Sequence, residues 1–238
     1  MKKLSIITIC YNIKDEIERT CESIVNQTWK DFEWIVVDGG STDGTVDVLN
    51  KYKKHMTVFI SEPDKGVYNA MNKGIKLAKG EWLNFMNGGD CFAENDVLEK
   101  VFKDKKYEAD ILYANLYLLD KGLKQNKTYP KRIDKNHFYN GNICHQSSFI
   151  KRELFDEFGL YDETYKICAD YEKWVIYASN NKKFQYLDIF SSIFYLGGIS
   201  ANHRKMMEER NNIKSKYYSK GYIFLKIFGI PILKIENK

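Results

Sequence analysis

Four short polar turns stand out in the first ninety residues, because each follows directly after an apolar run. Two of them place a carboxylate among glycines: Asp38 opens the turn 38–44, and Asp90 closes the turn 87–90. A carboxylate at a strand end can accept hydrogen bonds from a ribose hydroxyl or a base imide, and a glycine loop lets the backbone approach a diphosphate. One carboxylate also suits a hard divalent cation that takes its other oxygens from phosphates and water. Taken alone, each turn is more often a plain capped turn before a helix.

The elements that position these turns follow from the apolar periodicity. Short apolar runs indicate buried strands, and the segments between them repeat apolar residues at helical spacing. This alternation predicts right-handed crossovers and a mostly parallel sheet covered on both faces, which is an α/β fold. Ligands of such sheets bind beyond the carboxyl ends of the strands, so we expect the four turns to meet at one crevice. The expected strands are 4–9, 32–37, 56–60 and 81–86, and the turns after them are 10–12, 38–44, 62–66 and 87–90.

The second half of the chain is less regular and has no Pro-rich linker or repeat that would mark a boundary. Apolar runs predict further strands, and helical spacing predicts two further helices. The runs are 111–119, 147–150, 184–187 and 189–196, and the helical patterns are 170–178 and 202–218.

Composition narrows the class of protein. The 238 residues are 44% apolar, which is enough for a substantial core, and the net charge of +5 is too small and too evenly spread to indicate a nucleic-acid partner. The five cysteines form no CxxC pair, so neither a zinc site nor a disulfide framework is indicated, and a reducing compartment is expected. No run approaches the roughly 20 apolar residues of a membrane-spanning helix.

The four turns belong to longer motifs, SIITICYN, EWIVVDGGSTDGT, SEPDKGVYNAMNKG and LNFMNGGD. In order and spacing these motifs resemble family 2 glycosyltransferases with the GT-A fold, most closely the branch that builds bacterial O-antigen and capsular polysaccharide. The resemblance implies a Rossmann-like, mostly parallel central sheet flanked by helices, with a smaller acceptor-side subdomain. It implies one glycosyltransferase domain over 1–220, divided into a nucleotide-sugar-binding half at 1–92 and an acceptor-binding half at 93–220, followed by a basic, apolar tail at 221–238.

The resemblance also assigns roles to residues of the first half. Contacts with the nucleotide sugar are implied for Thr8, Tyr11, Asn12, Asp38, Asp64 and Asn87. Asp90 matches the last carboxylate of the family's DXD-type motif and would hold Mn²⁺ or Mg²⁺ against the diphosphate. Many members carry further aspartates where this chain has 87–89, so we expect the cation to depend on bound donor.

The segment 169–174 resembles the family's acidic segment beside the acceptor. Inverting transfer requires a carboxylate that takes the proton of the attacking hydroxyl, and Asp170 is the predicted base, with Glu172 as a substitute. A carboxylate in the first turn of a helix is also favoured by the helix dipole, which is the alternative interpretation of Asp170. His145 and His203 lie in segments that resemble the acceptor-side and lid loops, although a lone histidine is more often structural.

These features predict a metal-dependent, inverting glycosyltransferase of surface polysaccharide biosynthesis. It would move a sugar from a nucleotide-sugar donor, most simply a UDP-sugar, to a glycan or a polyprenyl-diphosphate-linked acceptor. A cytoplasmic protein is expected, and its tail 221–238 either contacts the inner face of the membrane peripherally or packs on the core. Two other classes remain open: a nucleotide-sugar-binding protein without catalysis, and a nucleotidyltransferase, although the latter usually has a basic glycine-rich loop where this chain has 10–13.

Overall fold

A computed structural model describes residues 2–198 and 202–218. Its strands are β1 Leu4–Cys10, β2 Phe32–Asp38, β3 Val58–Ser61, β4 Trp82–Phe85, β5 Cys91–Phe92, β6 Ile111–Asp120, β7 Leu123–Lys127, β8 Ser148–Lys151 and β9 Phe184–Tyr195. Its α-helices are α1 Lys14–Val25, α2 Thr45–Tyr52, α3 Val67–Leu77, α4 Val97–Phe102, α5 Lys135–Asn140, α6 Glu153–Phe158, α7 Ala169–Ser179 and α8 His203–Tyr217. Two 3₁₀ helices are η1 Lys53–His55 and η2 His145–Ser147.

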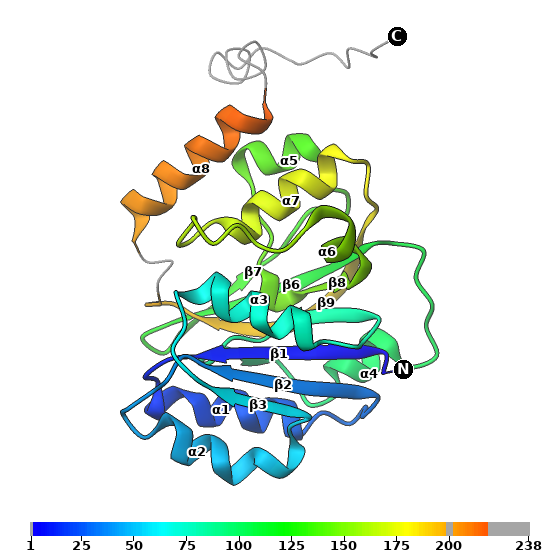
Figure 1. Ribbon diagram of the computed structural model, residues 1–238. Coiled ribbons are helices and arrows are strands. Elements are labelled where there is room, and N and C mark those ends of the chain that lie inside the picture. Colours follow the sequence, from blue (N-terminus) through cyan, green and yellow to red (C-terminus); the bar gives the residue numbers. More distant parts are fainter. Residues whose placement is uncertain (1, 199–201, 219–238) are drawn as a thin grey trace.

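One sheet runs through the molecule in the order β3-β2-β1-β4-β8-β6-β9-β5, with β7 paired to β6 (Figure 1). In its first half β1 pairs in parallel with β2 and β4, and β2 pairs in parallel with β3. The register aligns Cys10 with Asp38 and Asp38 with Ser61, so three strands end side by side. The strand and helix alternation predicted for the first ninety residues is confirmed.

Helices cover both faces of the sheet, because the central strands are apolar on both faces (Figure 1). Strand β1 is buried along its whole length. On one face α1, α2 and α4 pack against Leu4 and Trp34, and on the other face α3 and α7 pack against Ile7 and Phe85. Each helix therefore contributes one apolar stripe to a core that lies on its side of the sheet.

The second half departs from the sequence prediction in several places. The two runs predicted at 184–187 and 189–196 form one strand, β9, which pairs in parallel with β6 through a register shift after Ala114. Strand β8 is antiparallel to both β4 and β6, so the sheet is parallel in its first half and mixed in its second. The short elements β5, β7, α4, α5 and α6 were not predicted, since a segment of two to six residues shows no clear periodicity. The tail 221–238 lies outside the described residues.

Candidate active site

The turns after β1, β2 and β3 meet at one edge of the sheet, as the sequence predicts. The backbone N–H of Asn12 donates to Ser41 Oγ at 2.8 Å and joins the first turn to the second. A Cβ atom at Gly39 would lie 2.5 Å from Asp64 Oδ2 and 3.3 Å from Tyr11 Cδ2. Gly39 is therefore the point where the three turns come into contact, and a larger residue there would force the Asp64 carboxylate to shift.

Asp38 and Thr8, two of the residues predicted to contact the nucleotide sugar, are fully buried. The Asp38 carboxylate accepts hydrogen bonds from the hydroxyls of Ser41 and Ser61 and from backbone N–H groups of its own turn. Burial alone would raise the pKa of Asp38, but these donors outweigh it and hold the pKa below its ordinary value. Thr8 Oγ1 accepts a hydrogen bond from Trp34 Nε1 at 3.0 Å. Both polar side chains are therefore hydrogen-bonded inside the protein, where they hold the ends of β1 and β2 in place.

Tyr11 is one of the accessible residues predicted to contact the nucleotide sugar, with 61% of the residue exposed. Asn12 makes a second link between the first two turns, because its Oδ1 accepts a hydrogen bond from the Thr42 N–H at 2.9 Å. Asp64 Oδ1 accepts from the Gly66 N–H at 2.7 Å. The edge thus presents an exposed aromatic ring beside a partly exposed carboxylate, which is the combination that stacks on a base and bonds its polar atoms.

The turn 87–90 holds its carboxylate in an enclosed position. Asp90 is 6% exposed, and its oxygens accept hydrogen bonds from Gln146 Nε2 at 2.8 Å and from the Tyr195 N–H at 3.0 Å. Its backbone carbonyl accepts from the Thr20 hydroxyl at 2.6 Å. Burial raises the pKa of Asp90 to about 6, although the Gln146 and Tyr195 donors oppose the rise.

Asp170 lies across from this turn and is linked to it by a chain of polar contacts. Asp170 Oδ2 is 3.2 Å from His145 Nδ1, and the other ring nitrogen, Nε2, is 3.1 Å from Asn87 Nδ2. Asp170 Oδ1 is 3.1 Å from the Tyr68 hydroxyl, which also donates to the Ile167 carbonyl at 2.6 Å. The structure therefore joins three residues in one network: Asp170, which is the predicted base, His145, and Asn87 of the turn 87–90.

The remaining predicted residues do not join this network. Glu172 is 3% exposed, and its carboxylate accepts from Lys216 Nζ at 2.8 Å and from the Tyr217 hydroxyl at 3.1 Å. These contacts tie α7 to α8 and leave Glu172 outside the network of Asp170, and its role as a substitute base stays a prediction. His203 is the exposed first residue of α8, and no described contact links it to Asp170.

Three residues of the site were missed by the sequence interpretation. Tyr68 and Gln146 contact the two carboxylates directly, and Glu209 supports one of them from behind. The Glu209 carboxylate accepts from three consecutive backbone N–H groups, of residues 166–168, at 2.8, 2.9 and 3.0 Å. That loop leads into the first turn of α7, which carries Asp170. No local pattern marks these residues, because their partners lie 41 to 102 positions away.

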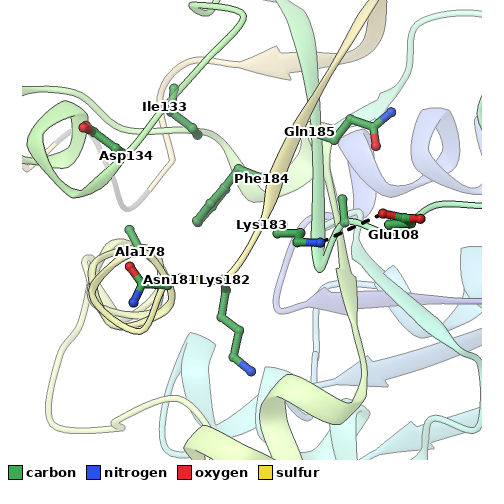
Figure 2. A pocket seen from close by; sticks show the side chains of 10 residues that line it. Glu108, Ile133, Asp134, Ala178, Asn181, Lys182, Lys183, Phe184 and Gln185 are labelled. Atoms are coloured by element: carbon green, nitrogen blue, oxygen red, sulfur yellow. Dashed lines mark ion pairs between the residues drawn. The ribbon is translucent and has the colours of Figure 1, made fainter.

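A hollow among the described residues lies elsewhere. It has a volume of about 570 Å³ and is lined by Glu108, Ile133, Lys183 and Phe184 among others (Figure 2). Phe184 begins β9 and Glu108 precedes β6, whereas the four turns follow the carboxyl ends of strands parallel to these. The hollow therefore opens at the opposite edge of the sheet and contains none of the predicted site residues.

Comparison with known proteins identifies the family. A sequence profile described as "Glycosyl transferase family 2" matches residues 5–159. The chain belongs to this family. Over 173 residues the glycosyltransferase is 34% identical to a "PGL/p-HBAD biosynthesis glycosyltransferase" of Mycobacterium tuberculosis (strain ATCC 25177 / H37Ra), a match that covers 71% of this chain and 66% of the relative. The chain thus spans slightly less than two thirds of that relative. Over 218 residues it is 26% identical to the Escherichia coli "UDP-Glc:alpha-D-GlcNAc-diphosphoundecaprenol beta-1,3-glucosyltransferase WfaP", with 90% of this chain and 86% of the relative covered.

Solved structures show that the glycosyltransferase has the GT-A fold. S. aureus TarS 1-349 in complex with UDP superposes with a TM-score of 0.69 at 17% identity, over 95% of this chain and 74% of that one. The mannosyltransferase PcManGT from Pyrobaculum calidifontis, in complex with GDP-Man and Mn²⁺, gives a TM-score of 0.64 at 17% identity, over 97% and 65% of the two chains. The predicted α/β architecture is therefore confirmed.

The side chains of the loop 87–90 offer too few ligands to hold a divalent cation by themselves. Within residues 2–198 and 202–218, no three histidine, cysteine, aspartate or glutamate side chains gather into a metal site. Asp90 is the one carboxylate of its loop, and Asn87 Oδ1 is a buried oxygen with no hydrogen-bond partner. Mg²⁺ and Mn²⁺ favour oxygen ligands and are commonly held by one or two protein groups plus substrate phosphates. The residues present match that arrangement.

Proposed function

We propose that this glycosyltransferase moves a hexose from a UDP-sugar to a glycan carried on a polyprenyl diphosphate, with inversion at the anomeric carbon. The observation that carries the proposal is the polar chain from Asn87 through His145 to Asp170, which holds a carboxylate opposite the donor loop. The name of the E. coli relative gives UDP-Glc as donor and a diphosphoundecaprenol-linked sugar as acceptor. S. aureus TarS has been solved with UDP and with UDP-GlcNAc, which supports a uridine nucleotide in the same fold.

Asp170 acts as the general base in this mechanism. It takes the proton of the acceptor hydroxyl while that oxygen forms a bond to the anomeric carbon, and the bond from the anomeric carbon to the diphosphate oxygen breaks. Displacement from the face opposite the leaving group inverts the configuration. Mn²⁺ or Mg²⁺ held by Asp90, with Asn87 beside it, would supply positive charge to the departing diphosphate.

The donor's base lies over the turns after β1 to β3 in this proposal. Tyr11 offers its exposed ring for stacking, and the Asp64 carboxylate beside Gly39 accepts hydrogen bonds from the base or ribose. Asp38 and Thr8 stabilise the strand ends that carry these turns, through their buried hydrogen bonds with Ser61 and Trp34.

The glycosyltransferase is proposed to act in the cytoplasm on acceptors presented at the inner face of the membrane. The described residues contain no helix that is both long and apolar enough to cross a bilayer. Helix α8 carries exposed Arg204 and Lys205, and such side chains attract anionic lipid by about 1 kcal/mol each near the surface. Peripheral contact through α8 and the tail 221–238 would bring the lipid-linked acceptor to Asp170.

The proposal is tested by measuring UDP release and UDP binding side by side. Purified protein is incubated with UDP-Glc or UDP-GlcNAc in EDTA, Mg²⁺ or Mn²⁺, with water as the substitute acceptor, and the expected result is slow release that requires the cation. Asp170→Asn is expected to lower release at least about 100-fold while UDP affinity stays within about twofold. The matched control is Asp156→Asn, whose side chain is 68% exposed on α6.

Two results would change the conclusion. Equal release by Asp170→Asn and the parent would show that the base is another residue. Tight cation-dependent UDP binding without release from any UDP-sugar would favour a nucleotide-sugar-binding protein, the class that the single carboxylate at Asp90 keeps open.

A further inference from the structure

Helix η2 directs two consecutive side chains at the two carboxylates of the site. His145 Nδ1 lies 3.2 Å from Asp170 Oδ2, and Gln146 Nε2 donates to Asp90 Oδ2 at 2.8 Å. The backbone of η2 is itself anchored, because Asn84 Nδ2 on the buried strand β4 donates to the Gln146 carbonyl at 3.2 Å. The position of His145 is therefore set by the core of the sheet, which is more rigid than a surface loop.

The contact on the far side of the ring decides which nitrogen of His145 carries the proton. Asn87 Nδ2 lies 3.1 Å from His145 Nε2, and an amide nitrogen only donates, so Nε2 accepts. A neutral ring then carries its proton on Nδ1, where it donates to Asp170. The side chains of His145 and Asp170 are only 15% and 11% exposed, so water competes weakly for this hydrogen bond.

The two oxygens of Asp170 are left in unequal environments. Oδ2 faces His145, whereas Oδ1 faces the Tyr68 hydroxyl at 3.1 Å. That hydroxyl has a single proton, and its shorter contact, 2.6 Å, is with the Ile167 carbonyl. Burial and the neighbouring Asp170 carboxylate raise the pKa of Tyr68, so the hydroxyl keeps its proton and takes none from Asp170. Oδ1 therefore retains a lone pair that can receive a proton.

We propose that His145 is the positioning residue of the base. Its Nδ1–H donates to Asp170 Oδ2 and holds the carboxylate so that Oδ1 faces the acceptor hydroxyl. Its Nε2 contacts Asn87 of the turn 87–90 on the other side of the ring. His145 contacts no substrate in this role and transfers no proton. The inference rests on the proposed function, in which Asp170 is the base. Without the ring the carboxylate rotates freely about its side-chain bonds, and the fraction of productive encounters falls.

The kinetic test compares two substitutions of His145 that differ in one hydrogen bond. His145→Ala removes both ring contacts, whereas the amide nitrogen of His145→Asn occupies nearly the place of Nδ1 and still donates to Asp170. We expect kcat for UDP release to fall about 10- to 100-fold in His145→Ala and to recover most of the way in His145→Asn, with the Kd for UDP unchanged in both. His55→Ala, in the exposed η1, is the matched control and should behave as the parent.

Two kinetic outcomes would overturn the inference. One is an unchanged kcat in His145→Ala. The other is a loss in His145→Asn as large as that in His145→Ala, because it would show that the Nδ1 donor is irrelevant. A melting curve of each variant verifies that the protein compared is folded.

A second measurement is independent of activity. The chain has four histidines, so long-range ¹H–¹⁵N correlation spectra of protein labelled at histidine resolve each ring, and His145→Asn identifies the signals of His145. We expect a protonated Nδ1 in the parent and a changed ring signal in Asp170→Asn. An unprotonated Nδ1 in the parent would refute the inference. Absence of UDP release from the parent would count against the proposed function alone, since the ring signal still shows whether His145 Nδ1–H donates to Asp170.

Discussion

Replacing Asp90 by asparagine is expected to stabilise the free glycosyltransferase while it removes the carboxylate proposed to bind the cation. Asp90 is 6% exposed, and burial raises its pKa from 3.8 to about 6. Keeping this carboxylate ionised at pH 7 therefore lowers the free energy of unfolding by about 3 kcal/mol. Asparagine removes that cost but can satisfy only one of the two donors, Gln146 and Tyr195, which loses about 1–2 kcal/mol. The net gain is about 1–2 kcal/mol, or about 2–8 °C in Tm for a chain of this size.

The pH dependence of this gain follows from the sign of the pKa change. The folded pKa of Asp90 lies above the unfolded value, so the native state binds the proton more tightly between about pH 4 and pH 6. The free energy of unfolding falls as the pH rises through this window, and the cost is fully present above about pH 6. The advantage of Asp90→Asn is therefore largest near pH 7.5 and disappears by about pH 4.5.

Thermal melts in EDTA at pH 7.5 and pH 4.5 measure this effect, with the exposed Asp156→Asn as the control that should shift neither curve. Addition of UDP and Mn²⁺ should raise the Tm of the parent and leave that of Asp90→Asn in place, because only the parent retains the ligand. A Tm for Asp90→Asn at or below the parent value at pH 7.5 would refute the reasoning, since it would mean that the buried carboxylate carries no desolvation cost.

Three further predictions concern the support of the site. Tyr11→Ala should weaken UDP binding by about 1–3 kcal/mol in calorimetry with Tyr11→Phe as control, because the exposed ring stacks on the base; unchanged affinity would place the base elsewhere. Glu209→Ala should lower the free energy of unfolding, measured in urea, by about 2–4 kcal/mol, because the N–H groups of 166–168 lose a charged acceptor. A loss under about 0.5 kcal/mol would mean that water replaces the carboxylate as their acceptor. Gly39→Ala should weaken UDP binding, because its Cβ would lie 2.5 Å from Asp64 Oδ2, and a variant that binds as the parent would show that the turns can separate without cost.

Much of the first half could be predicted because its information is local. The strands β1, β2 and β4 are short apolar runs, the helices between them repeat apolar residues at helical spacing, and each turn is marked by glycine and aspartate. The edge at which the turns meet follows from parallel pairing alone. The resemblance to family 2 glycosyltransferases rested on the same segments, and the profile that matches 5–159 confirms it.

The exposure of a carboxylate could not be predicted, because it depends on which donors surround it. Asp38 was expected to face a ligand, yet Ser41 and Ser61 enclose it, and the second of these lies 23 positions away. Glu172 was predicted as a substitute base, and Lys216 and Tyr217 hold its carboxylate towards α8. A residue type and its place in a helix indicate neither outcome.

The sequence by itself determined the secondary structure of the first half, the parallel sheet and the family, since all three depend on periodicity and on motifs of adjacent residues. Only the tertiary structure decided how the site is assembled. Tyr68 and Asp170 are 102 positions apart, and His145 joins the two halves from a 3₁₀ helix of three residues. Such contacts arise from packing of α7 and η2 against β4 and α3, and no local pattern encodes them, because the chain brings these side chains together only when the whole sheet has formed.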